Sequence, residues 1–213
     1  MPSTASRDFA ELMASVDQLI AIHARIQSGR GRRHRQEAIH RAGVVLTVAA
    51  WQAYVEKIAL EALAKIEAKI QVDDDGSPTP PWARASFKFR KPAVTKSVGD
   101  LNTPNSQNVV RLFDWSFGFD PRRYWVWDSP RRQWDSAKFC NRTDEWLRIR
   151  HSIAHGNSLP DNMGWIKNAS GTARLNLTLL RECQRHFREL VRRTDTAFIK
   201  FLKREYKVTG VGR

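Results

Sequence analysis

Residues 40–63, HRAGVVLTVAAWQAYVEKIALEAL, decide the structural class of this chain. Apolar side chains recur there at steps of three and four residues, the spacing that places side chains on one face of an α-helix. The stripe consists of Val44, Val48, Trp51, Val55, Ile58, Ala62 and Ile66. A second set makes the first half of the helix apolar almost all round: Leu46, Ala49, Ala50, Ala53 and Leu60. We therefore predict a helix over about residues 36–70 that lies in the middle of a bundle.

Three further segments have helical periodicity. One covers residues 7–27, and a second covers residues 136–155 and stops at Gly156 and Pro160. The last covers residues 174–207 and carries an apolar face that includes leucines, phenylalanines and Cys183. No segment alternates convincingly between apolar and polar side chains, and no internal repeat is present. These patterns predict an all-α fold, a bundle of four to five core helices.

The segment between the second and third of these helices, residues 71–135, is expected to be an irregular insertion. It opens with the loop signal VDDDGSPTPP and continues as a polar, basic stretch without clear periodicity. It then becomes aromatic, FDWSFGFDPRRYWVWDSPRRQW, with Pro and Gly breaks that favour short helices and turns. We interpret its tryptophans as packing residues more readily than as platforms for nucleic-acid bases. The whole chain, residues 1–213, is predicted to form a single domain around this insertion.

The charge of the chain is strongly positive. It has 213 residues, with 36 Lys and Arg against 22 Asp and Glu, which gives a net charge of +14. Such an imbalance favours polyanionic partners, nucleic acid first and an anionic membrane second, unless the surplus has no specific role. No signal peptide is visible, and the apolar run 42–51 is too short to span a bilayer. Two widely separated cysteines fit reduced thiols. We expect a cytoplasmic protein without a membrane partner.

Four arginines of the last helix lie within about 60° of one another around the helix axis. They are Arg181, Arg185, Arg188 and Arg192. Together with Arg33, in the basic connector GRGRRHR, they are candidates for contacts with nucleic-acid phosphates that do not depend on nucleotide sequence. The alternative is a solvated helix face with no ligand.

The segment RTDEWLRIRHSIAHGN, residues 142–157, carries the candidate chemistry. His151 and His155 are four residues apart and share a helix face, whereas Arg150 and His155 are separated by about 140° around a straight helix. One subunit would therefore not easily focus Arg150 and His155 on one phosphate. Two copies of this helix meeting at a two-fold axis would, because each Arg then faces the His of the other chain.

This segment resembles the Arg-x4-His motif of HEPN domains, with the polar His151 directly after Arg150 and the small Gly156 after His155. The stretch 40–63 is similar to the second helix of the RiboL-PSP-HEPN branch, in which Arg-Ala and an aliphatic run precede an acidic residue and Tyr. The last helix, with its Arg and Phe residues, also fits that branch. The acidic position of the second helix falls on Gln52 in this chain, with Glu56 one turn later.

The resemblance implies an endoribonuclease that needs no metal or other cofactor, acts as a homodimer and is often a toxin or an anti-phage effector. RNA carries its own nucleophile, the 2′-hydroxyl, so the protein has to move protons and stabilise charge. A histidine does the first and an arginine the second. We assign His155 as general acid/base, Arg150 as phosphate clamp, and His151 as an orienting residue or second proton-transfer group. The expected products carry a 2′,3′-cyclic phosphate and a 5′-hydroxyl.

Other interpretations remain open at this stage. Arg150 and His155 also suit the C-terminal turn of a helix, where basic side chains interact favourably with the helix dipole. His151 and His155 have the spacing of metal ligands, but no glutamate of an HExxH motif and no cysteine pair accompanies them. A catalytically inactive HEPN domain would bind RNA or serve as a dimerisation module. An antitoxin or another regulatory partner is expected if the protein is a toxin, and its RNA would then be a tRNA.

Overall fold

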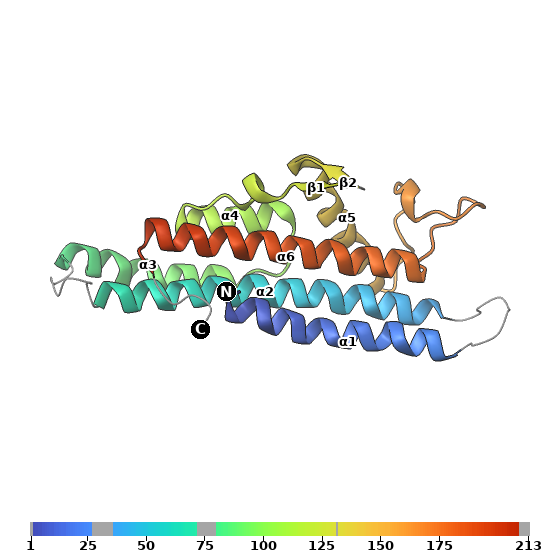
Figure 1. Cartoon of the computed structure of the whole chain (residues 1–213), viewed down its shortest axis with the longest axis horizontal. Coiled ribbons are helices and arrows are strands. Elements are labelled where there is room, and N and C mark those ends of the chain that lie inside the picture. The colour runs from blue at the N-terminus through green and yellow to red at the C-terminus, as the bar shows by residue number, and fades with distance from the viewer. Residues whose placement is uncertain (1, 27–35, 72–79, 131, 209–213) are drawn as a thin grey trace.

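A computed structural model describes residues 2–26, 36–71, 80–130 and 132–208 of the chain. Three long helices lie side by side along its longest axis (Figure 1). They are α1 (Thr4–Ile26), α2 (Glu37–Gln71) and α6 (Leu177–Glu205). The helices α2 and α6 run in the same direction, and α1 runs in the opposite one (Figure 1). The three helices predicted over residues 7–27, 36–70 and 174–207 are therefore confirmed.

The remaining elements cover the other side of α2 and α6 (Figure 1). In chain order they are α3 (Pro81–Gly99), α4 (Ser106–Phe117), the short 3-10 helix η1 (Pro121–Tyr124), strands β1 (Trp127–Ser129) and β2 (Arg132–Trp134), helix α5 (Ser136–Ala154) and the 3-10 turn η2 (Gly164–Ile166). The strands form one short antiparallel hairpin in which Trp127 pairs with Trp134. The fold is all-α, as the sequence predicts.

The predicted position of α2 in the middle of the bundle is correct. Trp51, Val55 and Ile58 are buried, and α1, α3, α5 and α6 all contact this helix. The side chain of Leu180 lies so close to Gly43 that a Cβ at Gly43 would be 2.6 Å from its Cδ1 atom, so glycine permits close packing of α2 and α6. Among the described residues α2 is also the only helix long and apolar enough to cross a membrane, but 56% of its apolar window is buried in the protein, as in the core helix of a soluble bundle.

The segment 71–135 differs from the irregular insertion expected from the sequence. It contains helices α3 and α4, and α4 contributes Val109, Leu112 and Phe113 to the hydrophobic core. The N-terminus of α4 is fixed from α5, because Asp144 accepts hydrogen bonds from the backbone N–H and the hydroxyl of Ser106, both at 2.7 Å. The periodicity of α3 is weak because Trp82 and Phe89 are exposed while Val94 and Val98 face inward.

The first turn of α1 is anchored by carboxylates from two other helices. The backbone N–H of Ser3 donates to Asp195 of α6 at 3.1 Å, and the Ser3 hydroxyl also donates to this carboxylate. Glu61 of α2 accepts from the backbone N–H of Ala5 at 3.2 Å. Burial raises the pKa of Asp195 above its usual range. The contact between Ser3 and Asp195 joins residues 192 positions apart, so the start of α1 depends on α6.

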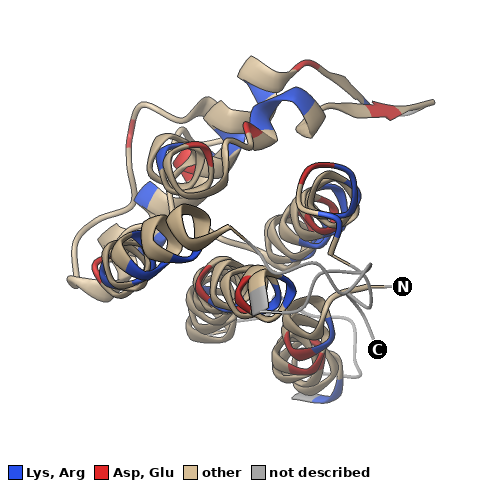
Figure 2. Cartoon of the chain, turned by 90° about the vertical axis from the view of Figure 1, so that its left-hand side faces the viewer, with Lys and Arg blue, Asp and Glu red and all other residues tan. Residues whose placement is uncertain are grey.

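Charged residues are distributed over the outward sides of the helices. Figure 2 shows the bundle from one end, with lysines and arginines mainly on the outer faces of the helices. The helix faces that point toward one another consist largely of uncharged residues. The surplus positive charge therefore lies on the surface, where it can interact with a polyanion.

Candidate active site

Helix α5 ends immediately before the second histidine of the motif. The backbone N–H of Gly156 donates to the carbonyl of Ile153 at 3.2 Å, and that of Asn157 donates to the carbonyl of Ser152 at 2.8 Å. This is the hydrogen-bond pattern of a Schellman motif, which requires a left-handed residue. Gly156 supplies it with φ of +69°. The helix stop predicted at Gly156 is confirmed, and it places His155 at the C-cap.

The two histidines of the motif lie next to each other at this helix end. The ring centroids of His151 and His155 are 4.3 Å apart, with the ring planes inclined at 48°. Both side chains are exposed to solvent. A group approaching the end of α5 from solvent therefore meets two imidazoles at once, which is sufficient for one proton donor and one proton acceptor.

Arg150 leaves α5 on a different face. Its position follows the buried residues Thr143, Trp146 and Leu147 by seven, four and three residues, so it continues the buried face of the helix. The side chain is half-buried, and its Nε atom is buried without a hydrogen-bond partner. In the described part of the chain no hydrogen bond or ion pair links Arg150 to either histidine. A single subunit brings the histidines together but not Arg150 and His155.

Gln52, which stands where the family resemblance leads us to expect a carboxylate, already forms two hydrogen bonds within the protein. The Gln52 amide donates to Glu56 at 3.0 Å and to the backbone carbonyl of Leu101 at 3.0 Å. These contacts tie α2 to the turn between α3 and α4. Within the described residues neither Gln52 nor Glu56 forms a hydrogen bond or ion pair with Arg150, His151 or His155. Glu56 therefore does not replace the missing carboxylate within one subunit.

A comparison with known families agrees with these features. The family model described as RiboL-PSP-HEPN matches residues 8–200, which include the motif and most of the bundle. The chain belongs to the RiboL-PSP-HEPN family. No curated protein and no solved structure matches it.

In this HEPN chain the loop after the motif is held against α5. The Arg142 guanidinium lies 3.9 Å from the centre of the Trp165 ring and forms ion pairs with Glu145 at 3.0 Å and Glu182 at 2.8 Å. Trp165 also packs edge-on against Trp146, with centroids 4.8 Å apart. The partly buried ion pair between Arg142 and Glu182 connects the first half of α5 to α6, and the contact with Trp165 connects it to the loop after the motif.

The tryptophans of the aromatic segment mostly pack inside the protein, as predicted. Trp125 is fully buried and donates a hydrogen bond to the Thr194 hydroxyl at 2.8 Å. The Arg132 guanidinium lies between the rings of Trp127 and Trp134, at 4.6 and 4.3 Å from their centres. Among the tryptophans of this segment Trp115 is the most exposed, at 47%.

One buried histidine has no counterpart in the sequence prediction. His186 of α6 is fully buried, and its Nε2 atom lies 2.8 Å from the Thr143 hydroxyl of α5. Because this hydroxyl donates to the Phe139 carbonyl at 3.0 Å, it accepts from His186, which must carry its proton on Nε2. Burial, together with the charges of Arg142 and Arg132, lowers the pKa of His186 to about 3. His186 is therefore a neutral structural residue that joins α5 to α6.

The four arginines proposed for RNA binding are brought together on α6. Arg181, Arg185, Arg188 and Arg192 are all exposed and line one hollow of about 670 Å³. Arg188 forms an ion pair with Asp17 of α1 at 2.9 Å, and Arg192 forms one with Glu189 at 2.6 Å. For Arg181 and Arg185 no ion pair occurs within the described residues. Arg33, the fifth candidate, lies outside the described residues.

The described residues contain no group of three or more His, Cys, Asp or Glu that is arranged to hold a metal ion. The two cysteines, Cys140 and Cys183, are free. Burial raises the pKa of both thiols, well above the usual range for Cys183. Both are therefore thiols at neutral pH and poor nucleophiles.

Proposed function

We propose that this HEPN protein is a metal-independent endoribonuclease that acts as a homodimer. Membership in the family supports a HEPN nuclease or an RNA-related module in general. The observation that favours cleavage is the exposed pair of His151 and His155 at the end of α5, on the same helix end as Arg150, which has no ion-pair partner in the described residues. Surplus positive charge on the surface suits a polyanionic substrate.

The proposed chemistry uses the 2′-hydroxyl of the RNA as nucleophile. His155 removes the proton from this hydroxyl or delivers one to the departing 5′-oxygen, and His151 performs the complementary transfer or orients His155. Arg150 binds the non-bridging phosphate oxygens and stabilises the negative charge that grows on them. The bond between phosphorus and the 5′-oxygen breaks as the 2′-oxygen attacks, which leaves a 2′,3′-cyclic phosphate and a 5′-hydroxyl.

The homodimer is part of the proposal because Arg150 and His155 do not meet within one subunit. Two copies of α5 related by a two-fold axis would place Arg150 of one subunit opposite His155 of the other. The side chain of Arg150 is half-buried and forms no ion pair within the described residues, so its exposed part is available to a phosphate or to a second subunit.

The direct test is incubation of purified protein with RNA in the presence of EDTA. We expect cleavage products that carry cyclic phosphate ends, and we expect Arg150→Ala and His155→Ala to abolish them without unfolding the protein. Arg148→Ala is the matched control, because Arg148 is an exposed arginine of the same helix on another face. Full activity of either motif variant would refute the assignment.

A second candidate is a catalytically inactive HEPN domain that binds RNA or mediates dimerisation. The observation in its favour is Gln52 at the position where relatives of this branch are expected to carry a carboxylate, with its amide engaged by Glu56 and Leu101. Protection of RNA from other nucleases without cleavage in EDTA would support this candidate.

We further propose that the protein acts in the cytoplasm as a toxin or an anti-phage effector, restrained by an antitoxin or another regulatory partner. The proposal follows from the proposed activity, since an unrestrained ribonuclease damages its host. Inducible expression in a bacterial host tests it. The wild type should stop growth and the His155→Ala variant should not, while equal growth of the two strains would contradict a toxic role.

A further inference from the structure

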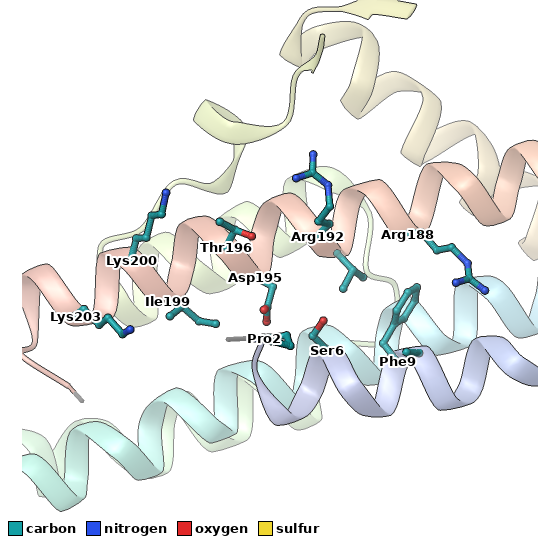
Figure 3. Close-up of a pocket in the computed structure, with 12 residues that line it drawn as sticks. Pro2, Ser6, Phe9, Arg188, Arg192, Asp195, Thr196, Ile199, Lys200 and Lys203 are labelled. Carbon is teal, nitrogen blue, oxygen red and sulfur yellow. The ribbon is translucent and has the colours of Figure 1, made fainter. Parts of the chain in front are cut away.

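A hollow of about 550 Å³ lies between α6 and the first turns of α1, away from the motif at the end of α5. Figure 3 shows α6 above it, with Lys200 and Arg192 upright and Arg188 and Lys203 at either end. Below it lie Ser6 and Phe9 of α1 and Pro2, which precedes this helix. Its volume is in the range of sites that hold small molecules or one unit of a polymer.

The rim of this hollow is cationic. Lys200 and Lys203 are exposed, and within the described residues neither forms an ion pair. Arg188 and Arg192 are paired with Asp17 and Glu189, but at side-chain exposures of 45% and 61% these pairs contribute little and are readily exchanged for another anion. Asp195 is the carboxylate that lines the hollow, and it is engaged by Ser3.

The floor of the hollow is apolar. It consists of Phe9 from α1 and Val191 and Ile199 from α6, all buried in the core. A double-stranded nucleic acid would meet only the rim, because its bases are stacked inside the duplex. A single strand can keep its phosphates at the cationic rim and turn a base toward the apolar floor.

The hollow continues into the one that contains the proposed RNA-binding arginines. Arg188 and Arg192 line both hollows, and the second adds Arg181, Arg185 and Trp127. From Arg181 to Lys203 the cationic face covers 22 helical steps, which corresponds to about 33 Å at about 1.5 Å per residue. A site of this length suits a polymer rather than a free nucleotide.

We infer that this face of α6, with the hollow beside α1, binds single-stranded RNA, with phosphates on Lys200, Lys203 and the four arginines and a base on the apolar floor. The inference rests on the proposed function, and it names the substrate class and a binding surface distinct from the motif. Long single strands should bind more tightly because they contact both the arginines of α6 and the hollow. Oligonucleotides too short to reach the hollow should lack this additional binding.

The test compares RNA binding in the His155→Ala background, so that binding is measured whether or not the protein cleaves RNA. Fluorescence anisotropy with a 20-nucleotide single strand gives the dependence of Kd on salt. The variant Lys200→Gln/Lys203→Gln should lower the slope of log Kd against log salt by about 1.4, at about 0.7 per phosphate contact. This corresponds to roughly 25-fold weaker binding at about 0.1 M salt if the two proteins converge near 1 M.

The control variant is Lys88→Gln/Lys96→Gln, which removes the same charge from exposed positions of α3. It should retain the slope of the wild type. A third variant, Thr196→Trp, fills the hollow from an exposed position at its edge and should weaken single-strand binding without changing the slope or the binding of a duplex.

The inference is overturned if the two double variants lose affinity equally, or if Thr196→Trp binds the single strand as the wild type does. It is also overturned if polyglutamate of the same charge binds as tightly as RNA, since this face of α6 would then bind an acidic protein equally well. Failure of the nuclease proposal is read separately, from the EDTA cleavage assay.

Discussion

Arg150 lies in the last turns of α5 and His155 is the C-cap of this helix, and no hydrogen bond in the described residues connects the two side chains. On an ideal straight helix, positions five residues apart differ by about 140° around the axis. His151 instead is the neighbour of His155, at 4.3 Å between ring centroids. If these residues form one site, Arg150 must come from a second subunit.

Mixing two inactive variants tests this arrangement. Arg150→Ala and His155→Ala subunits, unfolded together and refolded at equal amounts, should recover about a quarter of wild-type cleavage, because half of the dimers are mixed and each mixed dimer has one intact site. Each variant alone should be inactive. Activity that stays at zero in a sample shown to contain mixed dimers would place both groups of each site in the same chain.

Changing Gln52 to Glu should destabilise the protein and should not raise the cleavage rate. The Gln52 amide donates to Glu56 and to the Leu101 carbonyl, and a carboxylate at this position would face two acceptors. We expect a loss of about 1–3 kcal/mol in the free energy of unfolding at pH 7, measured with urea. The loss should be smaller at pH 5, where a carboxyl group next to another is more readily protonated. Faster cleavage by this variant would show that the carboxylate of the family does act here.

The neutral His186 should make the protein sensitive to mild acid. Its pKa is about 3 in the folded state and near 6.5 in the unfolded chain, so below pH 6.5 the unfolded state binds more protons. The stabilisation is complete above pH 6.5 and is lost as the pH falls, at up to about 1.4 kcal/mol per pH unit. His186→Phe should flatten the urea stability curve between pH 6.5 and 5, a window above the titration of ordinary carboxylates. Parallel curves for the two proteins would contradict this role.

Gly156 should be required for the geometry of the motif. Alanine at a φ of +69° costs about 1–2 kcal/mol, and relief of this strain would unwind the turn that carries His155. Gly156→Ala should therefore lower both the urea midpoint and the cleavage rate, whereas Gly156→Asn, which tolerates the left-handed region, should be affected less. Gly164→Ala is the control, because a Cβ there has nothing within 4 Å and Gly164 has no positive φ. Equal effects of Gly156→Ala and Gly164→Ala would contradict this explanation.

The long helices and the motif could be predicted because each depends on local periodicity. The helices over 81–99 and 106–117 were harder to find. In α3 Pro92 lies inside the helix and aromatic side chains face solvent, which obscures the apolar stripe. In α4 a signal was present, since Asn105 caps the helix by accepting from the backbone N–H of Asn108 at 2.7 Å and Gly118 ends it with φ of +71°.

Contacts between distant residues could not be predicted from the sequence. The partner of His186 is Thr143, 43 residues earlier, and nothing in either neighbourhood indicates the pair. The same holds for Ser3 and Asp195. The proposed approach of Arg150 to a second subunit would depend on a surface between copies of the chain, and the pattern of one helix does not describe such a surface.

The placement of α6 also determines when the protein can become functional during its synthesis. The pair of α1 and α2 can form early, because these helices are neighbours in sequence and share the largest helix contact of the fold. Leu180, Phe187 and Asp195 emerge from the ribosome only with the last helix, after the motif itself. Until then the part of α2 that packs against α6 is uncovered, and the first turn of α1 lacks its contact with Asp195. A nascent chain therefore lacks the contacts between α5 and α6 until α6 has been synthesised, and a product truncated before α6 would be a target for chaperones and proteases.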